Sequence, residues 1–299
     1  MKKFIRIPLL AASVAAMFMT VSCSRDNSSS SAAVKGAPAD AARITMENQV
    51  NAFKNGDLKA LYLTLPASYQ KDISSVVKAA AGKLDADLYK AGAGLLVSFA
   101  EIGESNSKLL AEMSPDEDKK VTAAEIKSAA VALKGLAKKL TLDTLKKGDV
   151  DEILSYKEVT DVFKLVQKNM PMPVTEVTGS EENEDGSVTV YFKDKDGDED
   201  EADYISVNGV WVPEEIAGDW DETIKGALES IAEFELDADT KEQIMSLIPT
   251  LKTSFETLKK AKTKDEFQMG VASAYMMMMM GGGGATFDFG EDDEDEDDE

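Results

Sequence analysis

The sequence predicts a predominantly helical α+β protein with a small antiparallel sheet of three to four strands flanked by helices. Three segments with different spacings of apolar residues lead to this prediction. In residues 39–169 apolar residues recur three or four positions apart, as on one face of a helix. In residues 174–213 they alternate with polar residues, as in a half-buried strand. The helical spacing returns in residues 219–275, so we expect one mainly helical domain from 39 to 275.

The first helices of this domain have recognisable ends. Asp40 begins the first helix and Asn55-Gly56 ends it. Asp57 can cap the next helix, because an aspartate accepts hydrogen bonds from the free amides of a first turn. Two longer helical stripes follow, and we expect a loop from Gly103 to Ser107 after them.

The strongest local signal in the chain is Ser114-Pro115-Asp116-Glu117. Its serine suits a helix cap, its proline the first helical position and its glutamate the third. We therefore expect a long helix to begin there. A short helix from Leu142 should end at Gly148, and Ser155-x-x-Glu158 has the spacing of another capping pair.

The sheet is predicted where the helical pattern breaks. Pro171 and Pro173 are too close to share one helix, and the spacing of apolar residues changes to two after them. Asn208-Gly209 stands between two strand-like runs, which is the best short-range marker of a hairpin. The first strand of the sheet is the least clearly marked.

The C-terminal helices are also marked by capping pairs. Thr240-x-x-Gln243 and Thr263-x-x-Glu266 each predict a helix start. Residues 276–299 are a low-complexity segment, with a run of methionines, a run of glycines and an unbroken acidic run to Glu299. Because like charges repel and glycines are costly to order, we expect a disordered acidic tail.

One short pattern occurs twice. Phe53-Lys54-Asn55-Gly56-Asp57-Leu58 and Leu145-Lys146-Lys147-Gly148-Asp149-Val150 share an apolar residue, a lysine, Gly-Asp and a second apolar residue. Gly-Asp can simply end one helix and cap the next. The alternative is a duplicated helical hairpin.

The first 22 residues have the composition of an export signal. Three cations precede an apolar run from Ile7 to Val21, and small residues stand just before Cys23. At about 15 residues the run is shorter than the roughly 20 that span a bilayer. We therefore expect residues 1–22 to be removed as a signal peptide.

Thr20-Val21-Ser22-Cys23 resembles the lipobox of bacterial lipoproteins, although that family usually has leucine where Thr20 stands. The resemblance implies that the Cys23 thiol receives a diacylglyceryl group and that the chain is cut before it. Cys23 is the only cysteine of the chain, so no internal disulfide can form. The alternative is an ordinary signal peptide cut at the same bond.

Residues 23–38 then form a lipidated cysteine and a Ser-rich tether with little to bury. As a flexible coil of about 15 residues, the tether reaches roughly 20 Å. Resemblance to the sorting rules of enteric-type envelopes implies the outer membrane, because Ser24 follows the cysteine in place of aspartate. We expect an exported protein anchored in the outer membrane or facing the periplasm.

A helix ending in Asn55-Gly56-Asp57 and a later sheet ending in Asn208-Gly209-Val210-Trp211-Val212 resemble exported proteins of the nuclear transport factor 2-like fold. The resemblance rests on these short segments. The helical segment from Leu84 to Met170 departs from that compact fold. The resemblance implies a pocket between the sheet and the helices.

The composition excludes several classes of chemistry. The chain has no histidine and, with Cys23 lipidated, no free thiol. Ser-His-Asp and Cys-His nucleophiles and structural zinc are therefore excluded, and no phosphate-binding glycine loop is present. We assign no catalytic residue and expect no cofactor. The net charge of −23, or −26 without the three signal cations, disfavours nucleic acid as a partner.

One acidic cluster has the composition of a calcium site. Its carboxylates belong to Asp194, Asp196, Asp198 and Asp200. Counted from the first of these, glycine is at the fourth position, whereas a helix-loop-helix calcium site needs it at the sixth. We expect a solvated hairpin tip here, with weak divalent-cation binding as the alternative.

These observations predict a non-catalytic, lipid-anchored protein of the cell envelope. It would bind the membrane through its lipid and an envelope protein as its partner, in an accessory role. One alternative is a carboxylate-dependent enzyme with a pocket between sheet and helices, which would need a buried acid of raised pKa. Another is an acidic cation-binding surface protein.

Overall fold

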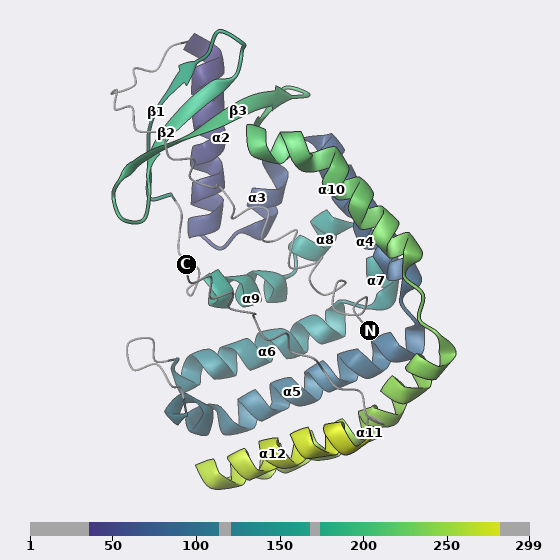
Figure 1. Cartoon of the computed structure of the whole chain (residues 1–299). Coiled ribbons are helices and arrows are strands. Elements are labelled where there is room, and N and C mark those ends of the chain that lie inside the picture. The colour runs from purple at the N-terminus through teal and green to yellow at the C-terminus, as the bar shows by residue number, and fades with distance from the viewer. Residues whose placement is uncertain (1–35, 114–120, 168–173, 282–299) are drawn as a thin grey trace, which may run out of the picture. The chain divides into compact units, whose positions relative to one another are not determined.

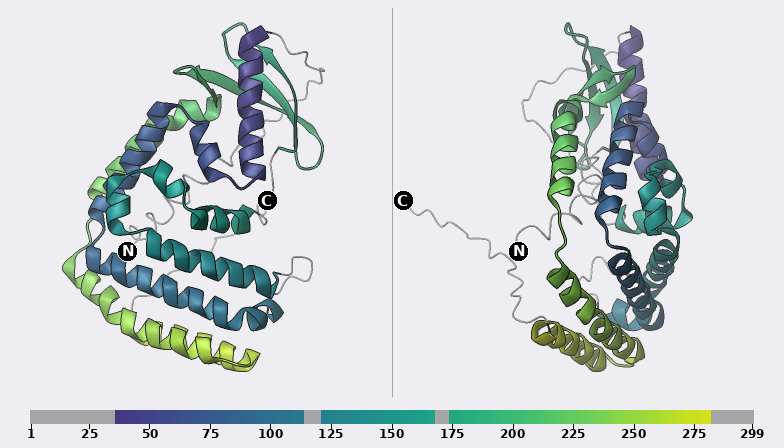
Figure 2. Two further views of the ribbon diagram at one scale, coloured as in Figure 1. Left: turned by 180° about the vertical axis from the view of Figure 1, so that it is seen from behind. Right: turned by 90° about the vertical axis from the view of Figure 1, so that its right-hand side faces the viewer.

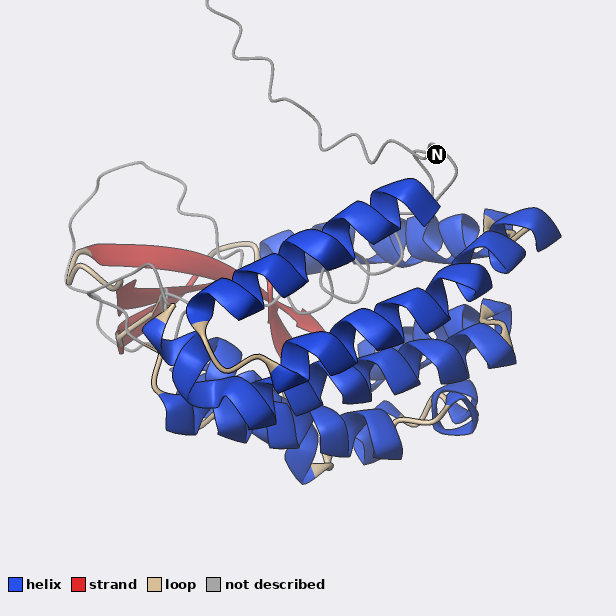
Figure 3. Cartoon of the chain, turned by 90° about the horizontal axis from the view of Figure 1, so that it is seen from below, coloured by secondary structure: helices blue, strands red, loops and turns tan. Residues whose placement is uncertain are grey.

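The computed structural model describes residues 36–113, 121–167 and 174–281 (Figure 1). The predicted fold class is confirmed: most of the described chain is helical, and one four-stranded antiparallel sheet packs against helices (Figure 3). The signal segment, Cys23, the Ser114 helix signal, Pro171, Pro173 and the acidic tail lie outside the described residues.

The described chain forms two compact units. The first contains the residues up to Tyr89 and those from Gly135 to Glu235, and the second contains Lys90 to Lys134 and the residues from Leu236 onward. Helices α5 and α6 each have residues in both units. The predicted domain from 39 to 275 therefore consists of two units, each made of separate pieces of chain.

The elements of the first unit follow the predicted order of helices, sheet and helix. They are α2 (Gly36–Lys54), α3 (Leu58–Leu63), α4 (Ala67–Lys83), α7 (Leu142–Lys147), α8 (Val150–Leu154), α9 (Lys157–Gln167), β1 (Glu176–Glu182), β2 (Val188–Lys193), β3 (Glu199–Val207), β4 (Val210–Pro213) and α10 (Glu214–Glu233). The remaining helices are α5 (Ala86–Glu112), α6 (Ala123–Lys139), α11 (Ala238–Lys260) and α12 (Lys264–Gly281).

The sheet is a meander in which each strand pairs with the next, in the order β1-β2-β3-β4. The hairpin between β3 and β4 turns at Asn208 and Gly209, with φ of 52° and 81°. Both angles are positive, as a tight two-residue hairpin requires, so the Asn-Gly prediction is confirmed. The first strand, predicted least clearly, carries a bulge between Val177 and Gly179.

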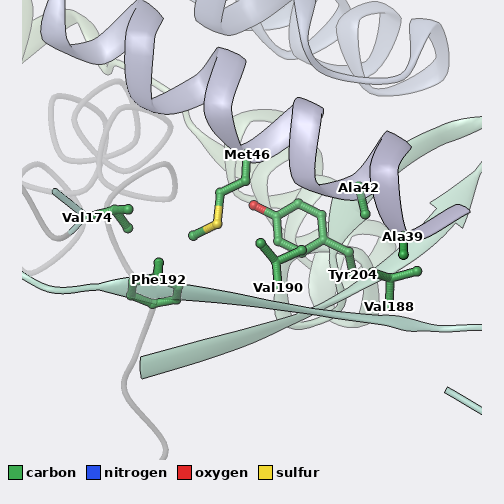
Figure 4. Packing of buried hydrophobic residues seen from close by; sticks show 8 residues of the cluster. All are labelled: Ala39, Ala42, Met46, Val174, Val188, Val190, Phe192 and Tyr204. Atoms are coloured by element: carbon green, nitrogen blue, oxygen red, sulfur yellow. The ribbon is translucent and has the colours of Figure 1, made fainter. Parts of the chain in front are cut away.

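Helix α2 covers the sheet, and its apolar face fills the space above β2 and β3 (Figure 4). Ala39, Ala42 and Met46 come from the helix, and the buried side chains below them come from alternate strand positions: Val188, Val190, Phe192 and Tyr204. The Tyr204 hydroxyl donates a hydrogen bond to Oε1 of Gln49 at 3.1 Å. Burial raises the pKa of Tyr204 far above its ordinary value, so the hydroxyl stays protonated as a donor.

A second core joins α4 and α10. The ring of Trp220 stacks on Tyr69 with centroids 3.9 Å apart and planes 6° from parallel. Trp220 Nε1 also donates a hydrogen bond to Oδ2 of Asp72 at 3.0 Å. Apolar contact and polar pairing therefore come from the same side chain, as a buried tryptophan requires.

The repeated Gly-Asp pattern ends one helix and caps the next in both places. Gly56 and Gly148 have φ of 64° and 69°, and Asp57 and Asp149 accept hydrogen bonds from amides in the first turns of α3 and α8. The capping interpretation is thus confirmed. Lys59 and Asp151, each two residues after its capping aspartate, form an ion pair of 2.9 Å. The duplicated hairpin stays a prediction.

The loop predicted from Gly103 to Ser107 is wrong, because α5 continues through it. Backbone angles leave the helical range at Asn106, with φ of −115° and ψ of 19°. The buried Nδ2 of Asn106 donates to the carbonyl of Leu258 at 2.9 Å. A long-range hydrogen bond therefore converts the expected loop into a kink.

The long helix predicted from Ser114 begins later, at Ala123. Thr122 and Glu125 form a capping box, in which the Glu125 amide donates to Thr122 Oγ1 and the Thr122 amide donates to the Glu125 carboxylate. Val121 and Thr122 are not helical, so α6 does not run on from Ser114.

Ser155 and Thr240 were each predicted to cap the start of a helix, and neither does so. Ser155 ends α8, and its hydroxyl donates to the carbonyl of Glu152. The cap of α11 is Asp237, which accepts from the Thr240 amide at 2.7 Å, so Thr240 lies within the first turn. The pair of Thr263 and Glu266 is confirmed, since the Glu266 amide donates to Thr263 Oγ1 at 3.2 Å.

In the second unit, α5, α11 and α12 share a small core. Ile102, Leu258, Ala261 and Phe267 are its buried members. An ionic network lies beside it: the Glu101 carboxylate pairs with Lys259 at 2.9 Å and with Lys134 at 3.3 Å. The network therefore links α5, α6 and α11.

We expect Glu101 to make the second unit sensitive to acid. The hydrogen bond from Lys259, and then that from Lys134, hold the pKa of Glu101 below its ordinary value of 4.5. A carboxyl group whose pKa is lowered in the folded state stabilises the fold at pH values above its ordinary, unfolded-state pKa. This stabilisation is lost as the pH falls through the lowered, folded-state pKa. Melting temperature measured from pH 6 to pH 2 should fall less steeply in Glu101→Gln than in wild type. Glu242→Gln, an exposed change on α11, should keep the wild-type slope.

Candidate functional site

Of the acidic cluster predicted from the sequence, Asp194, Asp196 and Asp198 lie in the turn between β2 and β3, and Asp200 lies within β3. Asp194 Oδ1 accepts hydrogen bonds from the amides of Asp196 and Asp198, at 2.8 and 2.9 Å. Gly197 supplies the positive φ of 88° that the turn needs. The Asp194 carboxylate is thus directed to the backbone of its own turn.

The other carboxylates of this cluster do not join Asp194. Asp200 Oδ1 accepts from the Glu201 amide at 2.9 Å, and Asp196 lies 3.7 Å from Lys195 Nζ. Within residues 36–113, 121–167 and 174–281, no three carboxylates, thiols or imidazoles lie together in a way that could hold a metal ion. Weak calcium binding stays a prediction, which calorimetric titration with calcium tests.

A chain of buried and half-buried polar side chains connects β3 to α2 and to the end of α3. Tyr204 donates to Gln49, and Gln49 Nε2 donates to Thr64 Oγ1 at 3.4 Å. Thr64 Oγ1 in turn donates to the carbonyl of Leu61 at 2.7 Å. This chain orients side chains of α2, α3 and β3 by neutral hydrogen bonds.

The enzyme alternative calls for a buried acid with a raised pKa. In the part of the chain that the structure describes, no aspartate or glutamate is buried. Partial burial, followed by the neighbouring charges of Asp203 and Asp200, raises the pKa of Glu201. Glu201 is nevertheless exposed on β3, and the enzyme alternative stays a prediction.

Helix α12 has the most unusual surface in the second unit. One side packs on α11 (Figure 2) through Phe267, Gly270 and Ala274, which recur at intervals of three and four. A Cβ at Gly270 would lie 2.8 Å from Leu258 Cδ2, so the two helices approach closely there. This side of α12 is a conventional packed stripe.

The opposite side of α12 is apolar and exposed. Met269 is 65% exposed, Tyr275 53% and Met276 64%. Met269, Ala272 and Met276 repeat the same intervals of three and four on the side away from α11. We call the exposed apolar residues Met269, Ala272, Tyr275 and Met276 the α12 outer face.

Sequence reasoning missed this surface, although a signal was present. From Phe267 to Gly281 the sequence contains no charged residue. Gln268 and Ser273 are polar, but most of the remaining residues are apolar, and a helix with so few polar residues needs partners on more than one side. A search for one apolar stripe on each helix does not detect a second stripe on the same helix.

No protein-family model matches the chain, and no curated protein or solved structure is significantly similar to it. The resemblances to bacterial lipoproteins and to nuclear transport factor 2-like proteins therefore stay predictions. Among the helices of the described residues, none combines the length and apolar character needed to cross a bilayer.

Proposed function

We propose that the mature protein is a lipid-anchored accessory protein of the bacterial cell envelope, which binds a partner protein without catalysing a reaction. The observation that carries the binding role is the α12 outer face, where Met269, Tyr275 and Met276 are more than half exposed. Large apolar residues gathered on one side of a helix are typical of interaction surfaces.

The anchoring role is supported by the N-terminal sequence. Cys23 follows an apolar run of signal-peptide length, and it is the only cysteine of the chain. A lipidated Cys23 would hold the protein at the membrane, because each buried CH₂ of an acyl chain contributes about 0.8 kcal/mol. The Ser-rich segment after Cys23 would let the folded part extend from the lipid surface.

Replacing the proposed lipid site should release the protein from the membrane. Cys23→Ala removes the thiol that would carry the lipid, so we expect the protein to move from the membrane fraction to the soluble fraction of lysed envelopes. Immunoblots of the two fractions measure the change. Ser22→Ala keeps a small residue before the cysteine and should leave the protein with the membrane. Retention of Cys23→Ala in the membrane would refute the anchor.

A further inference from the structure

We infer that Met269 and Met276 form a reversible oxidation site on α12, at which hydrogen peroxide converts each thioether to a sulfoxide. In each reaction the sulfur gives up two electrons and takes one oxygen atom. The S–O bond forms as the O–O bond of the peroxide breaks, and the rest of the peroxide leaves as water. The inference depends neither on the lipid anchor nor on the partner protein proposed above.

Both of these methionines are open to an oxidant in solution. Met269 is 65% exposed and Met276 is 64% exposed, whereas Met46 is 3% exposed. Met113 and Met245 are half-buried. The susceptibility of a sulfur to oxidation follows its exposure. Among these methionines, the two on α12 should therefore react first and Met46 last.

The two methionines lie on the same side of α12. They are seven residues apart, which is about two helical turns, or about 10.5 Å along the helix axis. The side of α12 that packs on α11 carries Phe267, Gly270 and Ala274 instead. An oxygen atom added to either methionine therefore meets water and lies away from the packed side.

Oxidation at these two positions changes the chemistry of the whole α12 outer face. A thioether is apolar, whereas a sulfoxide is polar and chiral. Of the four residues of the face, Tyr275 alone carries a polar group, and no charged residue occurs from Phe267 to Gly281. Two sulfoxides would therefore turn an apolar surface into a polar one, and their reduction would restore it.

Met46 shows what the same chemistry would do in a core. Its side chain lies between α2 and the sheet, close to Val190 and Phe192 (Figure 4). A sulfoxide there would bury a polar oxygen among apolar side chains, which costs stability. The fold thus encloses the methionine whose oxidation would damage it, and exposes the two whose oxidation changes only a surface.

The test measures oxidation in the folded protein. The protein is the chain from residue 23 to 299 with Cys23→Ser, so that no thiol is oxidised beside the methionines. It is treated with hydrogen peroxide, and fragment ions in tandem mass spectrometry assign each added oxygen to its methionine. We expect Met269 and Met276 to be oxidised about tenfold or more faster than Met46. In concentrated urea the rates should become equal, because the fold causes the difference.

Reversibility is measured on the same oxidised sample. Methionine sulfoxide reductases A and B, one for each sulfoxide epimer, should remove the added oxygen from Met269 and Met276 without unfolding the protein. The melting temperature of the oxidised sample should stay within about 2 °C of that of the untreated protein, since changes on an exposed surface have small effects.

Glutamine variants test the structural consequence separately, because glutamine has a polar group where the sulfoxide would carry its oxygen. Met269→Gln with Met276→Gln should leave the melting temperature within about 2 °C of wild type. Met46→Gln is the matched control and should lower it by roughly 5 °C or more, because its amide would be buried among apolar residues.

Three results would overturn the inference. Equal oxidation rates for Met46 and the two α12 methionines in the folded protein would show that the outer face is as closed as the core. A large fall in melting temperature in the Met269 and Met276 variant would show that the two side chains support the fold. Sulfoxides that resist both reductases would exclude reversibility. None of these measurements uses the lipid or a partner protein, so this inference and the proposed function can fail separately.

Discussion

Trp220→Ala is expected to cost about 3–5 kcal/mol of folding stability in the first unit, as large aromatic truncations in a core do. The substitution removes the stacked ring over Tyr69, whose centroid lies 3.9 Å away, and leaves Asp72 without the indole donor. Urea unfolding followed by near-ultraviolet circular dichroism measures the loss. Trp220 is 5% exposed, so water has little access to fill the cavity.

Trp220→Phe separates the two contributions. It keeps an aromatic ring against Tyr69 but loses the N–H that pairs with Asp72. We expect a smaller loss, about 1–3 kcal/mol, mainly from the polar partner left unpaired. If the alanine variant loses less than the phenylalanine variant, the stacked ring does not support the packing of α10 on α4.

Gly148→Ala is expected to cost roughly 2–4 kcal/mol, from backbone strain and a steric clash together. Gly148 has φ of 69°, and an added Cβ would lie 2.8 Å from the carbonyl oxygen of Ser74 in α4. Because the obstacle is helix backbone, it cannot turn away as a side chain would. Chemical denaturation of the purified variant measures the effect.

Gly186→Ala is the matched control for this prediction. Gly186 has φ of 86°, but an added Cβ meets nothing within 4 Å. Gly186→Ala should therefore lower the free energy of unfolding only by the strain of the left-handed backbone, about 1–2 kcal/mol. Equal losses in the two variants would mean that α4 yields to the new methyl group, and that the contact of Gly148 with α4 is not tight.

Local signals predicted the sheet and the short helices well, because their causes are local. The Asn208-Gly209 turn requires two positive φ angles, which few other residue pairs accept. The caps at Asp57 and Asp149 depend on amides within three residues. Neither feature needs information from elsewhere in the chain.

Features with distant causes could not be predicted. The continuation of α5 past Gly103 depends on Asn106 bonding to the carbonyl of Leu258, a residue 152 positions later. The start of α6 was misplaced because two capping signals, at Ser114 and at Thr122, follow each other closely, and a sequence does not rank them. The capping box at Thr122 is visible once the helix is known.

The α12 outer face could likewise be predicted only in part from the sequence. The uncharged stretch from Phe267 to Gly281 could be read from the sequence. Which side of that helix is covered depends on α11, since Gly270 fits against Leu258 while Met269 and Met276 remain exposed. The pattern indicates an apolar helix, and its neighbour decides which half of it is left for a partner.

Because the second unit is made of two separate pieces of chain, it can fold only after its second piece has been synthesised. All residues of the first unit exist once Glu235 has been synthesised, whereas Ile102 and Asn106 must wait for Leu258. At roughly 5–20 residues per second, a ribosome needs about 8–30 s to cover that interval. During this delay the apolar side of α5 has no partner from α11 or α12.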